Sequence, residues 1–100
     1  MAAADDIVDN PDKRRFEWVG DGHLAQLQYH LAGTRLTLVH TEVPDRLAGK
    51  GLGGGLVRAA LGRAAADGLT IVPTCPFARR WLTEHPDEVG DVTIDWSGFG

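Results

Sequence analysis

The sequence predicts an α+β domain in which a mixed, mostly antiparallel sheet is flanked by two main helices. Three observations lead to this prediction. Apolar and polar residues alternate in successive segments between residues 15 and 43, which is typical of half-buried strands. Residues 52–67 carry apolar side chains at helical spacing. The short apolar run at 69–73 follows that helix, so it is expected to run parallel to a neighbouring strand through a right-handed crossover.

Composition limits the size of the protein and the kinds of partner it has. The chain has 100 residues, of which 43% are hydrophobic and 24% charged, so we expect one domain over residues 1–100 with flexible ends at about 1–5 and 96–100. The net charge of −4 disfavours nucleic acid as a partner. The sequence has one cysteine, no pattern of a secretory signal and no apolar run near the ~20 residues that span a bilayer. We therefore expect a cytoplasmic protein with no membrane partner.

The amino-terminal segments are expected to form antiparallel strands. Residues 7–8 suit a short edge strand, and residues 15–19 and 23–31 form a hairpin around a glycine-containing turn. Period-two alternation places the polar side chains of the longer strand on one face. These side chains are Gln26, Gln28 and His30.

The next strand, residues 35–43, carries apolar groups on both of its predicted faces. Simple alternation places Leu36, Leu38 and His40 on one face, and Thr37, Val39, Thr41 and Val43 on the other. We therefore expect a central strand that is covered on both sides. Pro44 ends the strand, because proline has no N–H to donate to a ladder.

The carboxy-terminal half is expected to contain the two helices. The first begins within a glycine stretch and ends near Asp67, with Gly68 as the residue that follows its last turn. A second helix over residues 77–85 directs Phe77 and Trp81 inward and stops before a proline. Residues 92–96 suit a last short strand.

The glycine stretch is the strongest functional feature of the sequence. Five of the seven residues from 49 to 55 are glycine, and they lie between a strand and the first helix. A helix start has unpaired N–H groups and a partial positive charge, so a glycine loop leading into it lets phosphate oxygens approach the main chain. This pattern predicts a local site for an anionic ligand.

Two well-known phosphate-binding motifs fit this stretch poorly. Residues 49–54 formally match G-x-G-x-x-G, but the dinucleotide fold also needs an acidic residue after its second strand, and here that strand ends in Val72-Pro73-Thr74. A Walker P-loop needs Ser or Thr after its lysine, whereas Gly51 follows Lys50. We therefore disfavour a dinucleotide site and exclude a P-loop.

A family resemblance accounts for the stretch better. The segments LVHTEV, AGKGLG, GGLVRAALGRAAADG, LTIVP and TCPFARRWLTEHP, in this order, resemble the smallest single-domain members of the GNAT superfamily of N-acetyltransferases. The similarity extends over nearly the whole chain, from about residue 8 to residue 88. It implies the acyl-CoA N-acyltransferase fold and an acetyl-CoA-dependent transfer of an acetyl group to an amine.

The resemblance also implies where acetyl-CoA binds. The family loop pattern Gln/Arg-x-x-Gly-x-Gly/Ala places its glycines on Gly51 and Gly53, while its leading side chain falls on Ala48, which is a departure. Main-chain amides of the loop and first helical turn would hold the pyrophosphate, and the strand ending at Glu42-Val43 would part from the next strand to receive the pantetheine arm. The implied cofactor-binding residues are Glu42, Val43, Ala48, Gly49, Lys50, Gly51, Leu52, Gly53 and Gly54.

Three residues are candidates for catalysis. Acetyl transfer needs a base for the ammonium and an acid for the departing thiolate. Glu42 lies where many GNAT enzymes carry a carboxylate base, and His40, two residues earlier, is placed to relay the proton. Cys75, at a helix start, suits an acid, a nucleophile or a small buried apolar residue. Larger GNAT enzymes carry a tyrosine acid in the helix where this chain offers Phe77.

Several alternatives stay open at this stage. A CoA-binding module with little or no catalysis is the main rival, because the chain has almost nothing before its first strands from which to build a substrate lobe. A metal site or a hydrolase built from Cys75, His40 and Glu42 is disfavoured, because zinc-type spacing is missing and the glycine loop would have no role. The acceptor is a small-molecule amine or a protein lysine, and the protein is a monomer or a homodimer.

Overall fold

The computed structural model describes residues 6–20 and 22–98 of the chain. The flexibility expected at residues 1–5 and at the last two residues lies outside this part. The strands are β1 (Val8–Asn10), β2 (Arg15–Gly20), β3 (His23–Ala32), β4 (Arg35–Glu42) and β5 (Thr70–Pro73). The helices are α1 (Leu52–Asp67), α2 (Pro76–Glu84) and α3 (Pro86–Val89), with 3-10 turns at Pro11–Lys13, Asp45–Leu47 and Trp96–Gly98.

The five strands form one sheet in the order β1-β2-β3-β4-β5. The first four pair antiparallel, and β4 and β5 pair in parallel. This arrangement confirms the predicted α+β class with a mixed, mostly antiparallel sheet. The parallel pair arises because α1 carries the chain back over the sheet before β5 begins.

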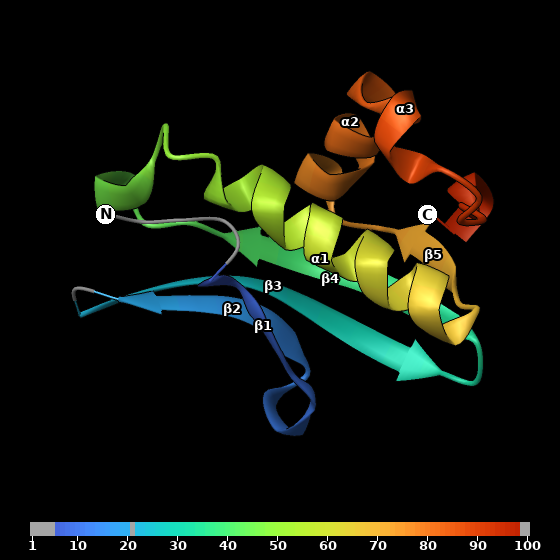
Figure 1. Ribbon diagram of the computed structural model, residues 1–100, viewed down its shortest axis with the longest axis horizontal. Helices are drawn as coiled ribbons and strands as arrows, with labels where there is room; N and C mark the ends of the chain where they lie inside the picture. The colour runs from blue at the N-terminus through green and yellow to red at the C-terminus, as the bar shows by residue number, and fades with distance from the viewer. Residues whose placement is uncertain (1–5, 21, 99–100) are drawn as a thin grey trace.

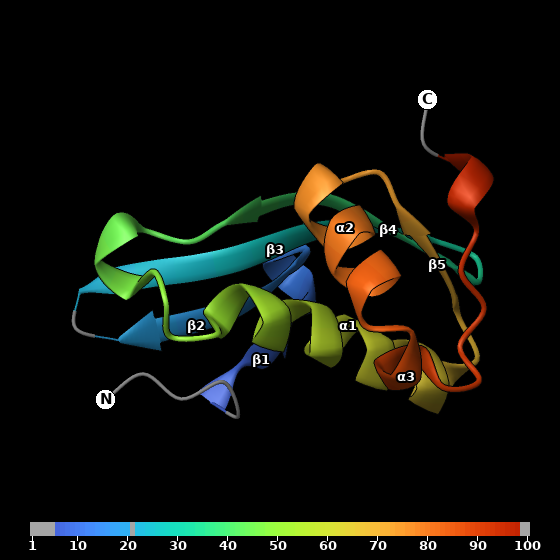
Figure 2. The same ribbon diagram turned by 90° about the horizontal axis from the view of Figure 1, so that it is seen from above.

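All the helices lie on one side of the sheet (Figures 1 and 2), where α1 contacts β2 and β3 and α2 contacts β4. Among the described residues, no α-helix covers the other face, so the expectation that β4 is covered on both sides was wrong. Val39 is 47% exposed, and His40 and Glu42 are also exposed. The core lies between the sheet and the helices, where strand residues that alternate inward meet the apolar stripe of α1. Its largest fully buried side chains include Phe16, Leu27, Leu36, Leu38, Leu52, Leu56 and Ile71.

A β-bulge interrupts β4 at Val39. Tyr29 pairs with Leu38 but Gln28 pairs with His40, so Val39 has no partner of its own on β3. One extra residue reverses the alternation that follows it. The predicted shared face of Leu36, Leu38 and His40 is therefore wrong, since the two leucines are fully buried and His40 faces solvent.

The carboxy-terminal segment forms less strand than expected. Residues 92–96 contribute only an isolated parallel bridge between Ile94 and Ile71 of β5. Two main-chain hydrogen bonds hold it, from Ile71 to Thr93 at 2.9 Å and from Asp95 to Ile71 at 2.8 Å. The residues that follow form the 3-10 turn at Trp96–Gly98. Within the described residues, no helix combines the length and hydropathy that a bilayer crossing requires.

Candidate active site

Pairing between strands β4 and β5 ends at Leu38. Their parallel register ends with Leu38 opposite Pro73, whereas β4 continues to Glu42. The Leu38 carbonyl closes the pairing, because it accepts hydrogen bonds from Thr74 N at 3.1 Å, Thr74 Oγ1 at 2.9 Å and Cys75 N at 2.9 Å. The chain then turns into α2. Residues 39–42 of β4 therefore have no strand partner on their β5 side in the described part of the chain.

The glycine loop leads from the end of β4 into α1. Gly49 and Gly51 have φ values of 79° and 75°, a left-handed conformation that glycine adopts without strain. Gly51 is the residue before the helix, and no side chain among the described residues caps it. The first turn contains no acidic residue, and the first helical bond joins Gly55 N to Gly51 O at 3.0 Å. The amides before this bond have no partner within the helix and give the helix start a partial positive charge, and Lys50, the residue before Gly51, is exposed.

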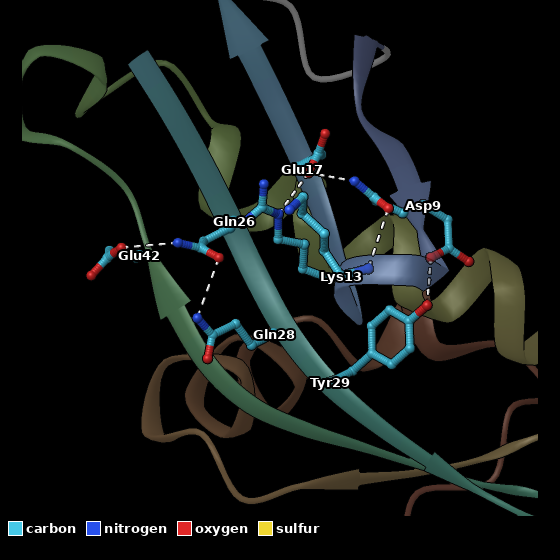
Figure 3. Close-up of polar contacts among 9 residues, drawn as sticks. Asp9, Lys13, Glu17, Gln26, Gln28, Tyr29 and Glu42 are labelled. Atoms are coloured by element: carbon cyan, nitrogen blue, oxygen red, sulfur yellow. Dashed lines mark hydrogen bonds and ion pairs between the residues drawn. The ribbon is translucent and has the colours of Figure 1, made fainter.

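Glu42 and His40 lie together on the helix-free face of the sheet. His40 Nε2 is 3.7 Å from Glu42 Oε2, and both side chains are more than half exposed, at 56% and 61%. Gln26, directly opposite Glu42 on β3, donates from Nε2 to Glu42 Oε1 at 3.0 Å (Figure 3). The structure thus brings two of the three catalytic candidates together and adds a contact with Gln26 that sequence reasoning missed.

Cys75 lies on the opposite side of β4 from this pair. Its side chain is 3% exposed and belongs to the core between the sheet and the helices. Its Sγ is 3.1 Å from Thr41 Oγ1, and either group can be the donor. Thr41 faces this side because the bulge at Val39 shifts the alternation of β4. The Cys75–His40–Glu42 cluster considered from the sequence therefore does not form.

The model of the family described as GCN5-related N-acetyl-transferase matches residues 15–92. The chain belongs to this family. Protein NATD1 from Bos taurus and from Homo sapiens are each 34% identical to the chain over 80 residues, which cover 75% of this chain and 71% of the relative. Protein NATD1 from Gallus gallus is 36% identical over 63 residues, covering 62% of this chain and 57% of the relative. These matches confirm the resemblance stated from the sequence.

The single tyrosine of the chain is engaged in hydrogen bonds of the fold. Tyr29 is 5% exposed, its hydroxyl donates to Asp9 Oδ1 at 2.6 Å, and it accepts from Arg63 NH1 at 3.0 Å. Burial, followed by the bond to Asp9, raises the pKa of Tyr29 above its usual value. Tyr29 therefore anchors β1 and α1 to β3, and the chain has no tyrosine left to act as an acid.

Two glycines of the family loop have a packing role that the sequence did not reveal. A Cβ on Gly53 would lie 2.6 Å from Phe77 Cζ, and a Cβ on Gly54 would lie 2.7 Å from Trp81 Nε1. The first turn of α1 thus packs directly on two rings of α2. Phe77, expected to point inward, remains 36% exposed, whereas Trp81 is buried at 8%. The spacing of the two aromatic residues, four apart on α2, was the only sequence signal of this contact.

Two cavities lie away from the glycine loop. One, of about 670 Å³, lies between the second half of α1 and residues 88–93, where Arg58 forms two hydrogen bonds with Glu88 at 2.7 and 2.8 Å. The other, of about 520 Å³, is lined by apolar residues that include Val89, Ile94 and Trp96. Neither cavity is lined by a predicted site residue. The described residues also contain no cluster of three or more His, Cys, Asp or Glu arranged for a metal ion.

Proposed function

We propose that the protein is an acetyl-CoA-dependent N-acetyltransferase that acts on an amine. One observation carries the proposal: the glycine-rich, uncapped start of α1 follows a strand, β4, whose last residues, 39–42, lie beyond its pairing with β5. Membership of the N-acetyltransferase family supports the reaction class. The acceptor is a small-molecule amine or a protein lysine.

The residues at the start of α1 suit the diphosphate of CoA. Their amides precede the first helical bond, no acid in the first turn repels an anion, and the exposed Lys50 adds a positive charge. Ala48 cannot supply the side-chain contact of the family pattern, so main-chain groups carry most of this binding. Main-chain groups of Glu42 and Val43 would pair with the pantetheine arm. Bound acetyl-CoA supplies the activated thioester.

Glu42 is the proposed base. Its carboxylate is 61% exposed and bonded to Gln26 on the face of the sheet away from α1, so we propose that the amine approaches from that side and the cofactor from the side of α1. Glu42 accepts the ammonium proton, and His40 passes it to solvent. Cys75, in contact with Thr41 on the helix side of β4, is placed either to protonate the departing thiolate or to pack the core.

The proposal is tested by binding and turnover in parallel. We expect CoA, but not NAD, to raise the melting temperature, and we expect thiol release from acetyl-CoA with a panel of polyamines, lysine peptides and aminoglycosides. Glu42→Gln should lower kcat by about 10²–10⁴-fold, the usual contribution of a general base. Glu84→Gln, an exposed carboxylate on α2, is the matched control and should retain full activity. Stabilisation by NAD alone would overturn the proposal.

A CoA-binding module without turnover is the second candidate. Two observations favour it: Cys75 is buried, and the Tyr29 hydroxyl is bonded to Asp9. Neither residue is therefore a solvent-exposed acid that could protonate the departing thiolate. In this case CoA would bind but no amine would cause thiol release. A third route passes through an acyl-enzyme on Cys75. The intact mass of the protein after incubation with acetyl-CoA detects this route, because it would increase by one acetyl group, and Cys75→Ala would abolish the increase.

A further inference from the structure

Gln26 is a buried polar side chain on the open face of the sheet. It alternates with the inward-facing Ala25 and Leu27 on β3 and so faces away from α1 and α2, yet only 7% of it is exposed. Both ends of its amide are engaged: Nε2 donates to Glu42 Oε1 at 3.0 Å, and Oε1 accepts from Gln28 Nε2 at 3.3 Å. A buried amide with both ends bonded has a defined orientation. We propose that Gln26 is a positioning residue that holds the Glu42 carboxylate in its reactive orientation.

The chain of hydrogen bonds has only one possible direction. An ionised carboxylate only accepts, so the Gln26 amide nitrogen must face Glu42 and its oxygen must face away. Gln28 then supplies the donor that this oxygen needs. The carboxylate of Glu42 thus sets the orientation of the Gln26 amide, Gln28 satisfies the Gln26 oxygen, and Gln26 holds one oxygen of Glu42.

The other carboxylate on this part of the face does not compete for Gln26. Glu17 pairs with Gln26 across β2 and β3, but its Oε1 already accepts from Arg15 Nε at 2.6 Å and from Asn10 Nδ2 at 3.2 Å. The bond from Arg15 lowers the pKa of Glu17, so this group stays ionised and paired. The amide nitrogen of Gln26 is therefore left to donate to Glu42 (Figure 3).

Glu42 needs such support because its surroundings hold it weakly. It is the last residue of β4, and its side chain is 61% exposed. A freely rotating carboxylate spends little time in one geometry, and a proton acceptor works only within hydrogen-bond reach of its donor. The bond from Gln26 occupies Oε1 and leaves Oε2 beside His40 at 3.7 Å, free for the incoming amine.

The geometric part of the inference has a test that needs no turnover. In NMR spectra of the whole chain, the side-chain amide signals of Gln26 should move when acid protonates the Glu42 carboxylate. The same signals should stay constant in Glu42→Gln. An amide that ignores pH in the unaltered protein, or that moves equally in Glu42→Gln, overturns the inference whether or not the protein is an enzyme.

The functional part rests on the proposed acetyltransferase activity. Gln26→Met keeps the length of the side chain but removes the donor, and it should lower kcat about tenfold or more while leaving KM for acetyl-CoA unchanged. The same substitution in a Glu42→Gln background should have almost no further effect, because Gln26 acts only through that carboxylate. Equal losses in both backgrounds would show a merely structural role and overturn the inference.

A second variant and a control guard against misfolding. Gln28→Met changes an exposed residue and should lower kcat less than Gln26→Met does, because Gln26 keeps its bond to Glu42 but loses its own support. His30→Ala, on the same face two residues further along β3, should leave kcat unchanged. Absence of turnover in the unaltered protein would refute the proposed function, and the NMR result would still decide whether Gln26 holds Glu42.

Discussion

Alanine substitutions at two glycines of α1 separate packing from ligand binding. Gly54 lies in the first turn, where an added Cβ would be 2.7 Å from Trp81 Nε1 and 3.4 Å from Cε2. Gly62 lies in the middle of the same helix with no atom within 4 Å of its Cβ position. Both substitutions gain helix propensity, so the difference between them isolates the contact with Trp81.

The magnitude follows from these surroundings. Gly62→Ala should stabilise the protein by about 0.5–1 kcal/mol, which raises the melting temperature by roughly 4 °C. In Gly54→Ala the ring of Trp81 cannot move aside, because it stacks on His85 with centroids 4.1 Å apart and lies under Arg58. Overpacking of this kind lowers the free energy of unfolding by about 1–3 kcal/mol. This loss outweighs the gain in helix propensity from alanine, which is smaller in the first turn than in the middle of the helix. We therefore expect Gly54→Ala to melt at least about 4 °C below Gly62→Ala.

Thermal and urea unfolding of the protein without ligand measure this difference directly. Gly53→Ala is an informative third variant, since Phe77 is 36% exposed and its ring can swing away from the new Cβ. It should lose less stability than Gly54→Ala. An increase in melting temperature for Gly54→Ala equal to that for Gly62→Ala would refute the packing role and leave ligand binding as the reason for that glycine.

Three further outcomes are expected. Hydrogen bonds from Ser97, then from an arginine, lower the pKa of Asp95 from 3.8 to about 2, so its stabilisation is present above about pH 4 and is lost as the pH falls toward 2. The unaltered protein should therefore melt above Asp95→Asn at pH values above about 4, and this difference in melting temperature should become smaller as the pH falls toward 2. Tyr29→Phe should lower the free energy of unfolding in urea by about 1 kcal/mol. Asp9→Ala should lower it more, because it also removes the ion pair with Arg63, which Tyr29→Phe leaves intact. Lys50→Met should weaken CoA binding by calorimetry about two- to fivefold with little change in unfolding, and an equal affinity would contradict its proposed role.

Local patterns were enough to predict most elements of the fold. The ends of α1 follow from Gly51 and Gly68, both of which adopt left-handed conformations at the helix boundaries. β5 and α2 follow from an apolar run and from the residues on either side of Pro76. These signals act within a few residues of one another, which is why they can be read along the chain. The glycine loop after β4 belongs to the same class of signal.

Tertiary structure decided which of the candidate residues meet. The bulge at Val39 has no sequence signature of its own, yet it turns Thr41 toward Cys75 and leaves His40 and Glu42 on the open face. The hydrogen bond from Gln26 to Glu42 likewise joins residues that lie sixteen positions apart along the chain. The sequence by itself determined the elements, because these depend on neighbouring residues, and on the same local basis it predicted an anion site at the glycine loop. Only the pairing of distant strands could assign each side chain to one face of the sheet or the other.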